Sequence, residues 1–183
     1  GALIDTPILQ QDLADELYIG LSTLKSSIKT VKEDISDYDL LIENHKNQGM
    51  MVVGSERALR RAIFDRLFSN HDAREQTLIQ IDSYMDGKCL RQIVIHVISS
   101  YDLILTDDSL THLLDDIRIM PLRASRGYHV NYRISESKEI ETQQEFSMAT
   151  AILEEIYQQI GIDVVIGEAY YLAQHLIASK RYR

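Results

Sequence analysis

The feature that most restricts the fold of this chain is the helical spacing of apolar residues along positions 78–183. Apolar side chains recur three or four positions apart, which places them on one face of an α-helix. Four such stripes are present: Leu90, Ile93, Val94, Val97, Ile98 and Tyr101; Leu110, Leu113, Leu114 and Ile117; Phe146, Ala149, Ile152, Leu153, Ile156 and Ile160; and Tyr171, Leu172, His175 and Leu176. Helices with one apolar face and short connections pack together, so this region is predicted to form an all-helical bundle.

A few residues are expected to set helix boundaries in this bundle. Thr106 or Asp107 can cap the second helix, because a side-chain oxygen there accepts a hydrogen bond from a backbone N–H of the first turn. Pro121 has no backbone N–H, so it is expected to end or kink that helix near Met120. Gly161 is expected to close the third helix as its C-cap.

The N-terminal part contains two shorter amphipathic stretches separated by a glycine. The first has apolar residues at helical spacing, namely Leu13, Ala14, Leu17 and Tyr18. Gly20 supplies a permissive backbone for a tight turn, and Ser22 or its neighbourhood is expected to cap a second helix. The apolar face of that second helix comprises Leu24, Ile28, Val31 and Ile35. Two short helices joined by a tight turn are the pattern of a helix-turn-helix.

The second of these helices has no acidic residue between positions 21 and 32, although the chain carries a net charge of -9. The same segment contains three lysines, and a carboxylate among them would be repelled by the phosphates of DNA. The pattern therefore predicts a surface that faces DNA, and the alternative is an ordinary solvated helix face. The expected DNA contacts from this helix are Ser22, Thr23, Lys25, Ser26 and Lys29, with Lys32 on the same side.

A β-hairpin is predicted directly after the helix-turn-helix. Residues 41–44 and 50–53 read as short strands, and the turn between them is His-Lys-Asn-Gln-Gly. A hairpin in this place is the wing of a winged helix, and its Lys46 and Asn47 are expected to contact DNA. Residues 55–68 form a further helix, interpreted as a connection with charged flanks. The alternative is that its arginines, Arg57, Arg60, Arg61 and Arg66, also reach DNA.

The polar segment "SNHDAREQT" at 69–77 predicts a linker, so the expected domains are a winged helix-turn-helix at 1–68 and a helical bundle at 78–183. The fold class is therefore mainly α. The chain begins with Gly rather than Met, and we interpret it as a fragment of a longer protein. Cys89 is the only cysteine, so no internal disulfide forms and a reducing, cytoplasmic compartment is expected. No apolar run approaches roughly 18 residues, so no membrane partner is expected.

Three segments of the N-terminal domain carry a family resemblance. They are "LADELYI", "STLKSSIKTVKEDI", and "GMMVVGSE" followed by Arg60. These segments resemble the winged helix-turn-helix of Mga-type and BglG-type bacterial regulators, which implies DNA as a partner. The chain departs from the family in the turn, where Gly20 and Leu21 replace the usual Ser-Arg. The phosphate or base contact of that position is therefore not carried over.

Two segments of the helical domain resemble a PRD, the phosphotransferase-system regulation domain. They are "LLDDIRIMPLRASRGYHV" and "FSMATAILEEIYQQIGIDVVIGEAYYLAQHLIASK". The second contains an E-x-x-Y-L-x-x-H-L signature as Glu168, Tyr171, Leu172, His175 and Leu176. The resemblance implies a dimeric transcriptional regulator controlled by phosphocarrier proteins of the sugar phosphotransferase system. It also implies that His175 is phosphorylated, whereas the spacing alone is more typical of a histidine packed on an apolar helix face.

The other phosphorylation position of the PRD family is altered in this chain. The family places a histidine seven residues before an arginine, and counting back from Arg123 gives Asp116. A carboxylate carries about half the charge of a phosphoryl group, so Asp116 is expected to imitate part of the phosphorylated state. Arg118 and Arg123 are the nearest residues in sequence to pair with it. The alternative is a solvated surface carboxylate without regulatory effect.

One cluster has the residue types and the spacing of a metal site. His112, Asp115 and Asp116 lie at i, i+3 and i+4 of one helix. No second cluster supplies further ligands, so neither a metal nor another cofactor is expected. Cys89 has no patterned partner and no glycine-rich phosphate loop exists, so no catalytic residues are expected either. Two other classes stay open: an interaction module that dimerises without phosphorylation, and a helical metal-dependent enzyme that uses this cluster.

Overall fold

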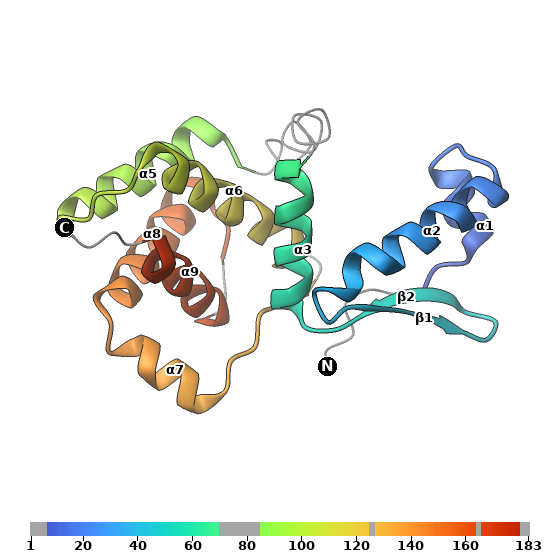
Figure 1. Cartoon of the computed structure of the whole chain (residues 1–183). Helices are drawn as coiled ribbons and strands as arrows, with labels where there is room; N and C mark the ends of the chain where they lie inside the picture. Colours follow the sequence, from blue (N-terminus) through green and yellow to red (C-terminus); the bar gives the residue numbers. More distant parts are fainter. Residues whose placement is uncertain (1–6, 70–84, 125–126, 164–165, 180–183) are drawn as a thin grey trace. The chain divides into compact units, whose positions relative to one another are not determined.

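The computed structural model describes residues 7–69, 85–124, 127–163 and 166–179, and it confirms a mainly α fold (Figure 1). The chain divides into two compact units, Gly1–Arg66 and Leu67–Arg183. Most of the predicted linker at 69–77 lies outside the described residues. Its first residue, Ser69, is the last residue of a helix. No described helix combines the length and the apolar composition that a membrane span requires.

The first unit opens with helices α1, Gln10–Glu16, and α2, Leu21–Ser36. The two helices pack together, and each has one buried residue, Ala14 in α1 and Leu24 in α2. The cap of α2 lies in the predicted neighbourhood but is not Ser22, because α2 begins at Leu21 and its N-cap is Gly20, which has no side chain to accept a hydrogen bond.

The predicted apolar face of α2 is fully buried only at Leu24, and Ile28 and Ile35 are half-buried. Leu24 is buried, whereas Val31 is 42% exposed. The helix α1 has seven residues and α2 has sixteen, so at about 1.5 Å per residue α1 is too short to cover the second half of α2. Val31 therefore belongs to the apolar face by its spacing but is not buried.

The wing is an antiparallel hairpin of β1, Leu41–His45, and β2, Gly49–Val53. Both predicted strands are confirmed, each one residue longer at the turn. A third segment, which the sequence did not predict, pairs with β2: the backbone N–H of Met50 donates to the carbonyl of Ile8 at 2.8 Å, and the N–H of Ile8 donates back at 2.9 Å. Gly49 permits this approach, because a Cβ there would lie 2.1 Å from the Ile8 carbonyl oxygen.

The helix α3, Glu56–Ser69, follows the wing and contains a buried ion pair. Ser55 caps the helix, since its hydroxyl oxygen accepts a hydrogen bond from the N–H of Ala58 at 3.0 Å. One turn further in, Nε of Arg60 donates to Oε1 of Glu56 at 3.0 Å, and both side chains are almost fully buried. Arg60 is therefore a structural residue, and the alternative that it reaches DNA is wrong.

The end of α2 is tied to α3 by a side-chain hydrogen bond. The hydroxyl of Tyr38 donates to Oδ2 of Asp65 at 2.6 Å. The carboxylate of Asp65 raises the pKa of Tyr38 above its usual value, because the hydrogen bond favours the protonated hydroxyl. Arg66 lies 3.5 Å from Asp34 of α2. These contacts support the interpretation of α3 as the helix that connects to the winged helix-turn-helix.

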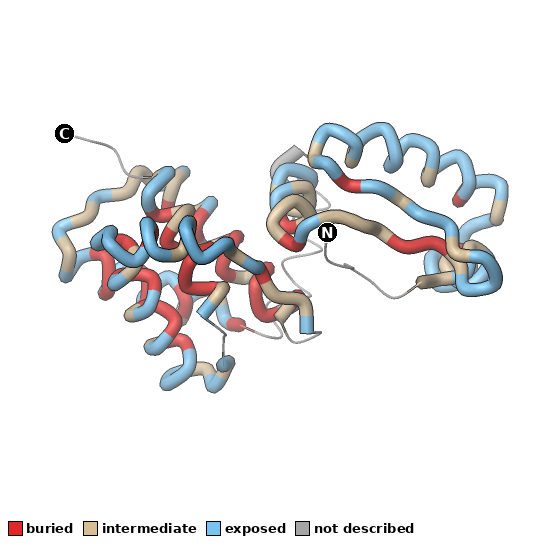
Figure 2. Tube along the Cα trace, turned by 90° about the horizontal axis from the view of Figure 1, so that it is seen from below, coloured by how far each residue is buried: buried red, intermediate tan, exposed pale blue. Residues whose placement is uncertain are grey.

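The second unit is a bundle of five helices within the described residues: α5, Gly87–Ser100; α6, Asp107–Ala124; α7, Ile134–Glu141; α8, Gln144–Ile160; and α9, Ile166–Ser179. Buried residues line the inner faces of these helices (Figure 2). The first three predicted stripes are confirmed as core faces, with α8 packed against α5 and α9. In the fourth stripe Leu172 and Leu176 belong to the core, whereas His175 is one-third exposed. The short α7 was not predicted, because eight residues contain too few turns to show a stripe.

The helix α6 departs from its predicted end. Thr106 caps its start as expected, with its hydroxyl oxygen accepting from the N–H of Ser109 at 3.2 Å. The helix does not end near Met120 but continues through the buried Pro121 to Ala124. This turn includes the buried residues Met120 and Arg123. Their burial offsets the loss of the backbone hydrogen bond that a proline cannot donate. Gly161 closes α8 in the left-handed conformation, with φ 81°, as predicted.

Candidate functional site

The exposed face of α2 presents the residues that the sequence assigns to DNA. All of the predicted contacts are exposed: Ser22, Thr23, Lys25, Ser26 and Lys29. Lys32 is exposed as well, and the first turn of α2 contains no acidic residue. We call Lys25, Lys29 and Lys32 the basic face of α2. It starts beside the turn after α1, in the position of a recognition helix.

The tip of the wing presents a second polar surface in the same unit. Lys46 and Asn47 are both exposed. Asn47 has φ 65°, a left-handed conformation that asparagine tolerates better than most residues. Its side chain therefore projects from a tight turn of defined shape. Nε2 of His45, at the base of the turn, lies 3.4 Å from the carboxylate of Glu43 on the same strand.

In the second unit, α6 and α9 bring together the two positions that the sequence treats as separate phosphorylation sites. Nδ1 of His175, on α9, lies 2.8 Å from Oδ2 of Asp116, on α6. The side chain of Asp116 is 6% exposed and that of His175 is 33% exposed. The ring of Tyr171 meets the imidazole edge-on, with the ring centroids 4.5 Å apart. We call this contact the Asp116–His175 pair.

The pair determines which nitrogen of His175 is available for chemistry. A carboxylate is only an acceptor, so the hydrogen bond requires a proton on Nδ1. In a neutral imidazole the lone pair then resides on Nε2. Because Asp116 is buried and His175 is one-third exposed, the contact lies on the protein side of the ring. The hydrogen bond at Nδ1 therefore holds the imidazole ring and leaves Nε2 available as a nucleophile.

The expected pairing of Asp116 with arginines is wrong within the described residues. Its recorded partner is His175, and Nη1 of Arg118 lies 3.9 Å from Oδ1 of Asp115 instead. Residues two positions apart do not share a helix face, whereas residues three apart do. The guanidinium of Arg123 lies 4.3 Å from the centre of the Tyr128 ring.

Burial of Asp116 also excludes the alternative that this residue is a solvated surface carboxylate. Asp116 is 5% exposed, so the interpretation as a solvated surface carboxylate is wrong. The neighbouring Asp115 is buried too and faces Arg118, whereas His112 is exposed. In the described part of the chain, no group of three or more histidine, cysteine, aspartate or glutamate residues is arranged to hold a metal ion.

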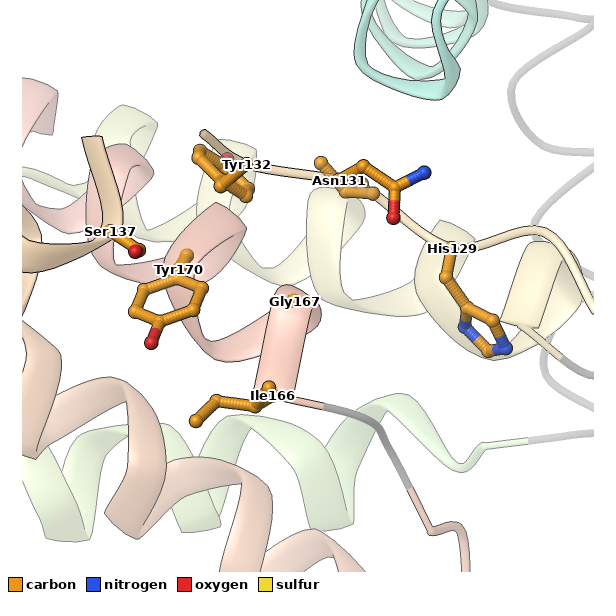
Figure 3. A pocket seen from close by; sticks show the side chains of 8 residues that line it. His129, Asn131, Tyr132, Ser137, Ile166, Gly167 and Tyr170 are labelled. Carbon is orange, nitrogen blue, oxygen red and sulfur yellow. The ribbon is translucent and has the colours of Figure 1, made fainter. Parts of the chain in front are cut away.

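A second histidine next to a buried carboxylate lies at the other end of α9. Nδ1 of His129 lies 3.9 Å from Oε1 of Glu168, which is fully buried. His129 also lines a pocket of about 350 Å³, together with Tyr132, Gly167 and Tyr170 (Figure 3). The sequence did not predict this site, because His129 lies outside every helical stripe.

One wall of this pocket is fixed by tyrosine hydroxyls. Tyr170 donates to Glu141, and Tyr132 donates to Gln174 at 2.7 Å. The hydrogen bond to Glu141 raises the pKa of Tyr170 above its usual value, and burial of the hydroxyl acts in the same direction. Tyr170 therefore stays protonated. Its ring also packs against that of Phe146, with the ring centroids 5.1 Å apart.

Both units match known families. Residues 6–68 match the Mga helix-turn-helix domain, and residues 91–179 match the PRD domain. The chain is 23% identical over 182 residues to the "Probable licABCH operon regulator" of Bacillus subtilis (strain 168), covering 98% of this chain and 28% of that protein. It is 21% identical over 176 residues to "Transcriptional regulator ManR" of the same organism, covering 95% of this chain and 27% of that protein. The chain thus spans about a quarter of the length of these relatives.

Proposed function

Because the chain belongs to the PRD-containing bacterial transcriptional regulators, we propose that it binds operator DNA and that phosphorylation of His175 controls this binding. The phosphoryl group comes from phosphocarrier proteins of the sugar phosphotransferase system. In this proposal residues 1–68 are the DNA-binding domain, 69–77 the linker and 78–183 the PRD. The protein acts in the cytoplasm as a homodimer and is not an enzyme.

The DNA-binding part of the proposal is supported by the surface of the first unit. The basic face of α2 is exposed and free of acidic residues through position 32. Lysines in this arrangement neutralise phosphates, and Ser22, Thr23 and Ser26 supply hydroxyl groups for phosphates or base edges. The wing adds Lys46 and Asn47, whose exposed side chains fit backbone or minor-groove contacts beside a recognition helix.

The regulatory part of the proposal is carried by one observation, the Asp116–His175 pair. His175 is one-third exposed, and the 2.8 Å contact at Nδ1 leaves Nε2 as the nitrogen that can accept a phosphoryl group. A phosphoryl group adds about -1.5 to -2 charges at neutral pH. Placed at a dimer contact, that charge changes the contact and with it the spacing of the two DNA-binding domains.

Phosphotransfer from a purified phosphocarrier protein, followed by mapping of the modified residue, tests this proposal. We expect phosphate on His175 and complete loss of labelling in His175→Ala. The matched control is His112→Ala, which removes an exposed histidine of the same unit and is expected to label like the parent. An unlabelled parent chain would favour the phosphorylation-independent interaction module. Label on His112 would contradict the assignment of the site.

A further inference from the structure

We propose that Asp116 is a positioning residue for His175 that keeps the proton on Nδ1 and directs the phosphoryl group to Nε2. This inference rests on the proposed function, because it describes how the same histidine is prepared for phosphorylation. It replaces the expectation that Asp116 permanently imitates a phosphoryl group. The position at which the PRD pattern has its first histidine is thus occupied by an aspartate that positions the second histidine, His175.

The geometry separates the two roles of Asp116. A carboxylate that imitates a phosphoryl group has to be exposed at the same protein surface as the phosphoryl group. The carboxylate of Asp116 is 6% exposed, and its Oδ2 lies 2.8 Å from Nδ1 of His175. The charge is therefore directed at the imidazole, which matches the general arrangement of a base or nucleophile held by a third group.

The orientation of the ring is fixed from two sides. Asp116 on α6 holds Nδ1, and Tyr171 on the preceding turn of α9 packs edge-on against the ring. A ring flip would exchange Nδ1 for a carbon in front of the carboxylate and lose the hydrogen bond. Leu172 and Leu176, which flank His175 on α9, are both buried, so the backbone that carries the histidine is anchored in the core.

The transfer step balances with this arrangement. The lone pair of Nε2 forms a phosphorus–nitrogen bond as the phosphorus–nitrogen bond of a phosphohistidine on the carrier protein breaks. The electrons of the broken bond leave with the imidazole of the carrier, and the proton on Nδ1 of His175 stays in place. The phosphorylated ring then carries a positive charge beside Asp116, and the carboxylate stabilises that charge.

The tautomer of His175 tests the inference without any phosphotransfer. Nitrogen NMR of the ¹⁵N-labelled chain at about pH 9, where ordinary histidines are neutral, distinguishes a proton on Nδ1 from one on Nε2. We expect Nδ1–H for His175 in the parent chain. A proton on Nε2 would overturn the inference, whether or not the chain is phosphorylated. The parent chain is sufficient for this measurement, so it does not depend on the folding of a variant.

Substitution of the carboxylate tests the effect on the reaction. Asp116→Asn lets an amide N–H point at Nδ1, which favours the other tautomer; a serine protease in which this change was made lost activity for that reason. Loss of a group that orients a metal-ligating histidine commonly costs about 10- to 100-fold in activity, and we take the same range for a histidine that accepts a phosphoryl group. We expect phosphotransfer to slow by this factor, the ¹⁵N signals to shift toward Nε2–H, and Asp116→Glu to recover part of the rate.

The controls separate failure of the inference from failure of the proposed function. Asp108→Asn removes an exposed carboxylate from the same helix and is expected to leave rate and tautomer unchanged. A phosphorylated parent with an equally fast Asp116→Asn variant would overturn the inference and leave the proposed function standing. An unphosphorylated parent with Nδ1–H on His175 would overturn the proposed function and leave the tautomer assignment standing. Phosphate found on Nδ1 of the parent would overturn the positioning role.

Discussion

Replacing both Lys25 and Lys29 with alanine is expected to weaken operator binding about 60-fold at about 0.1 M salt. Each phosphate contact contributes roughly 0.9 to the slope of log affinity against log salt concentration, so two lost contacts lower this slope by about 1.8. Both lysines are exposed on α2. The measurement is a series of mobility-shift titrations at several salt concentrations, with DNA from upstream of the gene that encodes the chain.

The matched control removes two lysines from the other unit. Lys88 and Lys138 are exposed on α5 and α7, and their replacement by alanine changes the net charge of the chain by the same amount. This variant is expected to retain the affinity and the salt slope of the parent. Equal losses in the two double variants would mean that α2 is not the DNA-binding surface. A Lys25/Lys29 variant with the affinity and slope of the parent would contradict the proposed recognition helix.

Glu56→Ala is expected to lower the free energy of unfolding of the first unit by about 3–5 kcal/mol. The substitution removes the carboxylate that lies 3.0 Å from Nε of Arg60, and both side chains are almost fully buried. Removing one member of a buried ion pair is strongly destabilising, in contrast to removing an exposed charge. Amide hydrogen exchange along α3, measured with native chain, reports the stability of this unit separately from that of the helical bundle.

The control for this substitution is Glu16→Ala, which removes an exposed glutamate from α1 of the same unit. Exposed ion pairs contribute about 0–1 kcal/mol, so this variant is expected to exchange like the parent. A loss below about 1 kcal/mol in Glu56→Ala would contradict the structural role assigned to the Glu56–Arg60 pair.

Helical periodicity predicted four of the five described helices of the bundle, α5, α6, α8 and α9, because each of them is long enough to show an apolar stripe. The stripe of α5, from Leu90 to Ile98, is buried as the spacing requires. The same reasoning placed Lys25 and Lys29 on the exposed side of α2. Periodicity assigns a residue to a face of its own helix, and that is enough for a core residue or a surface lysine.

The contacts between elements were not predictable in this way. Periodicity does not tell which helices become neighbours, so it did not show that Asp116 meets His175. The pairing of Ile8 with Met50 depends on a strand segment too short to show alternation. Pro121 was expected to end or kink α6, as a proline does in an isolated helix, whereas in the folded unit α6 continues through it to Ala124. These features all arise from tertiary packing, which overrides local preference.

The regulatory link between the two units leads to one comparison. Operator affinity is measured for the phosphorylated and the unphosphorylated chain in the same mobility-shift assay, with His175→Ala carried through the same phosphotransfer mixture. Coupling free energies of ligand and modification sites are typically 1–3 kcal/mol, so we expect the affinities of the two forms to differ by about 5- to 150-fold. His175→Ala is expected to show no difference. Equal affinities for a fully phosphorylated and an unphosphorylated chain would contradict the claim that phosphorylation of His175 controls DNA binding.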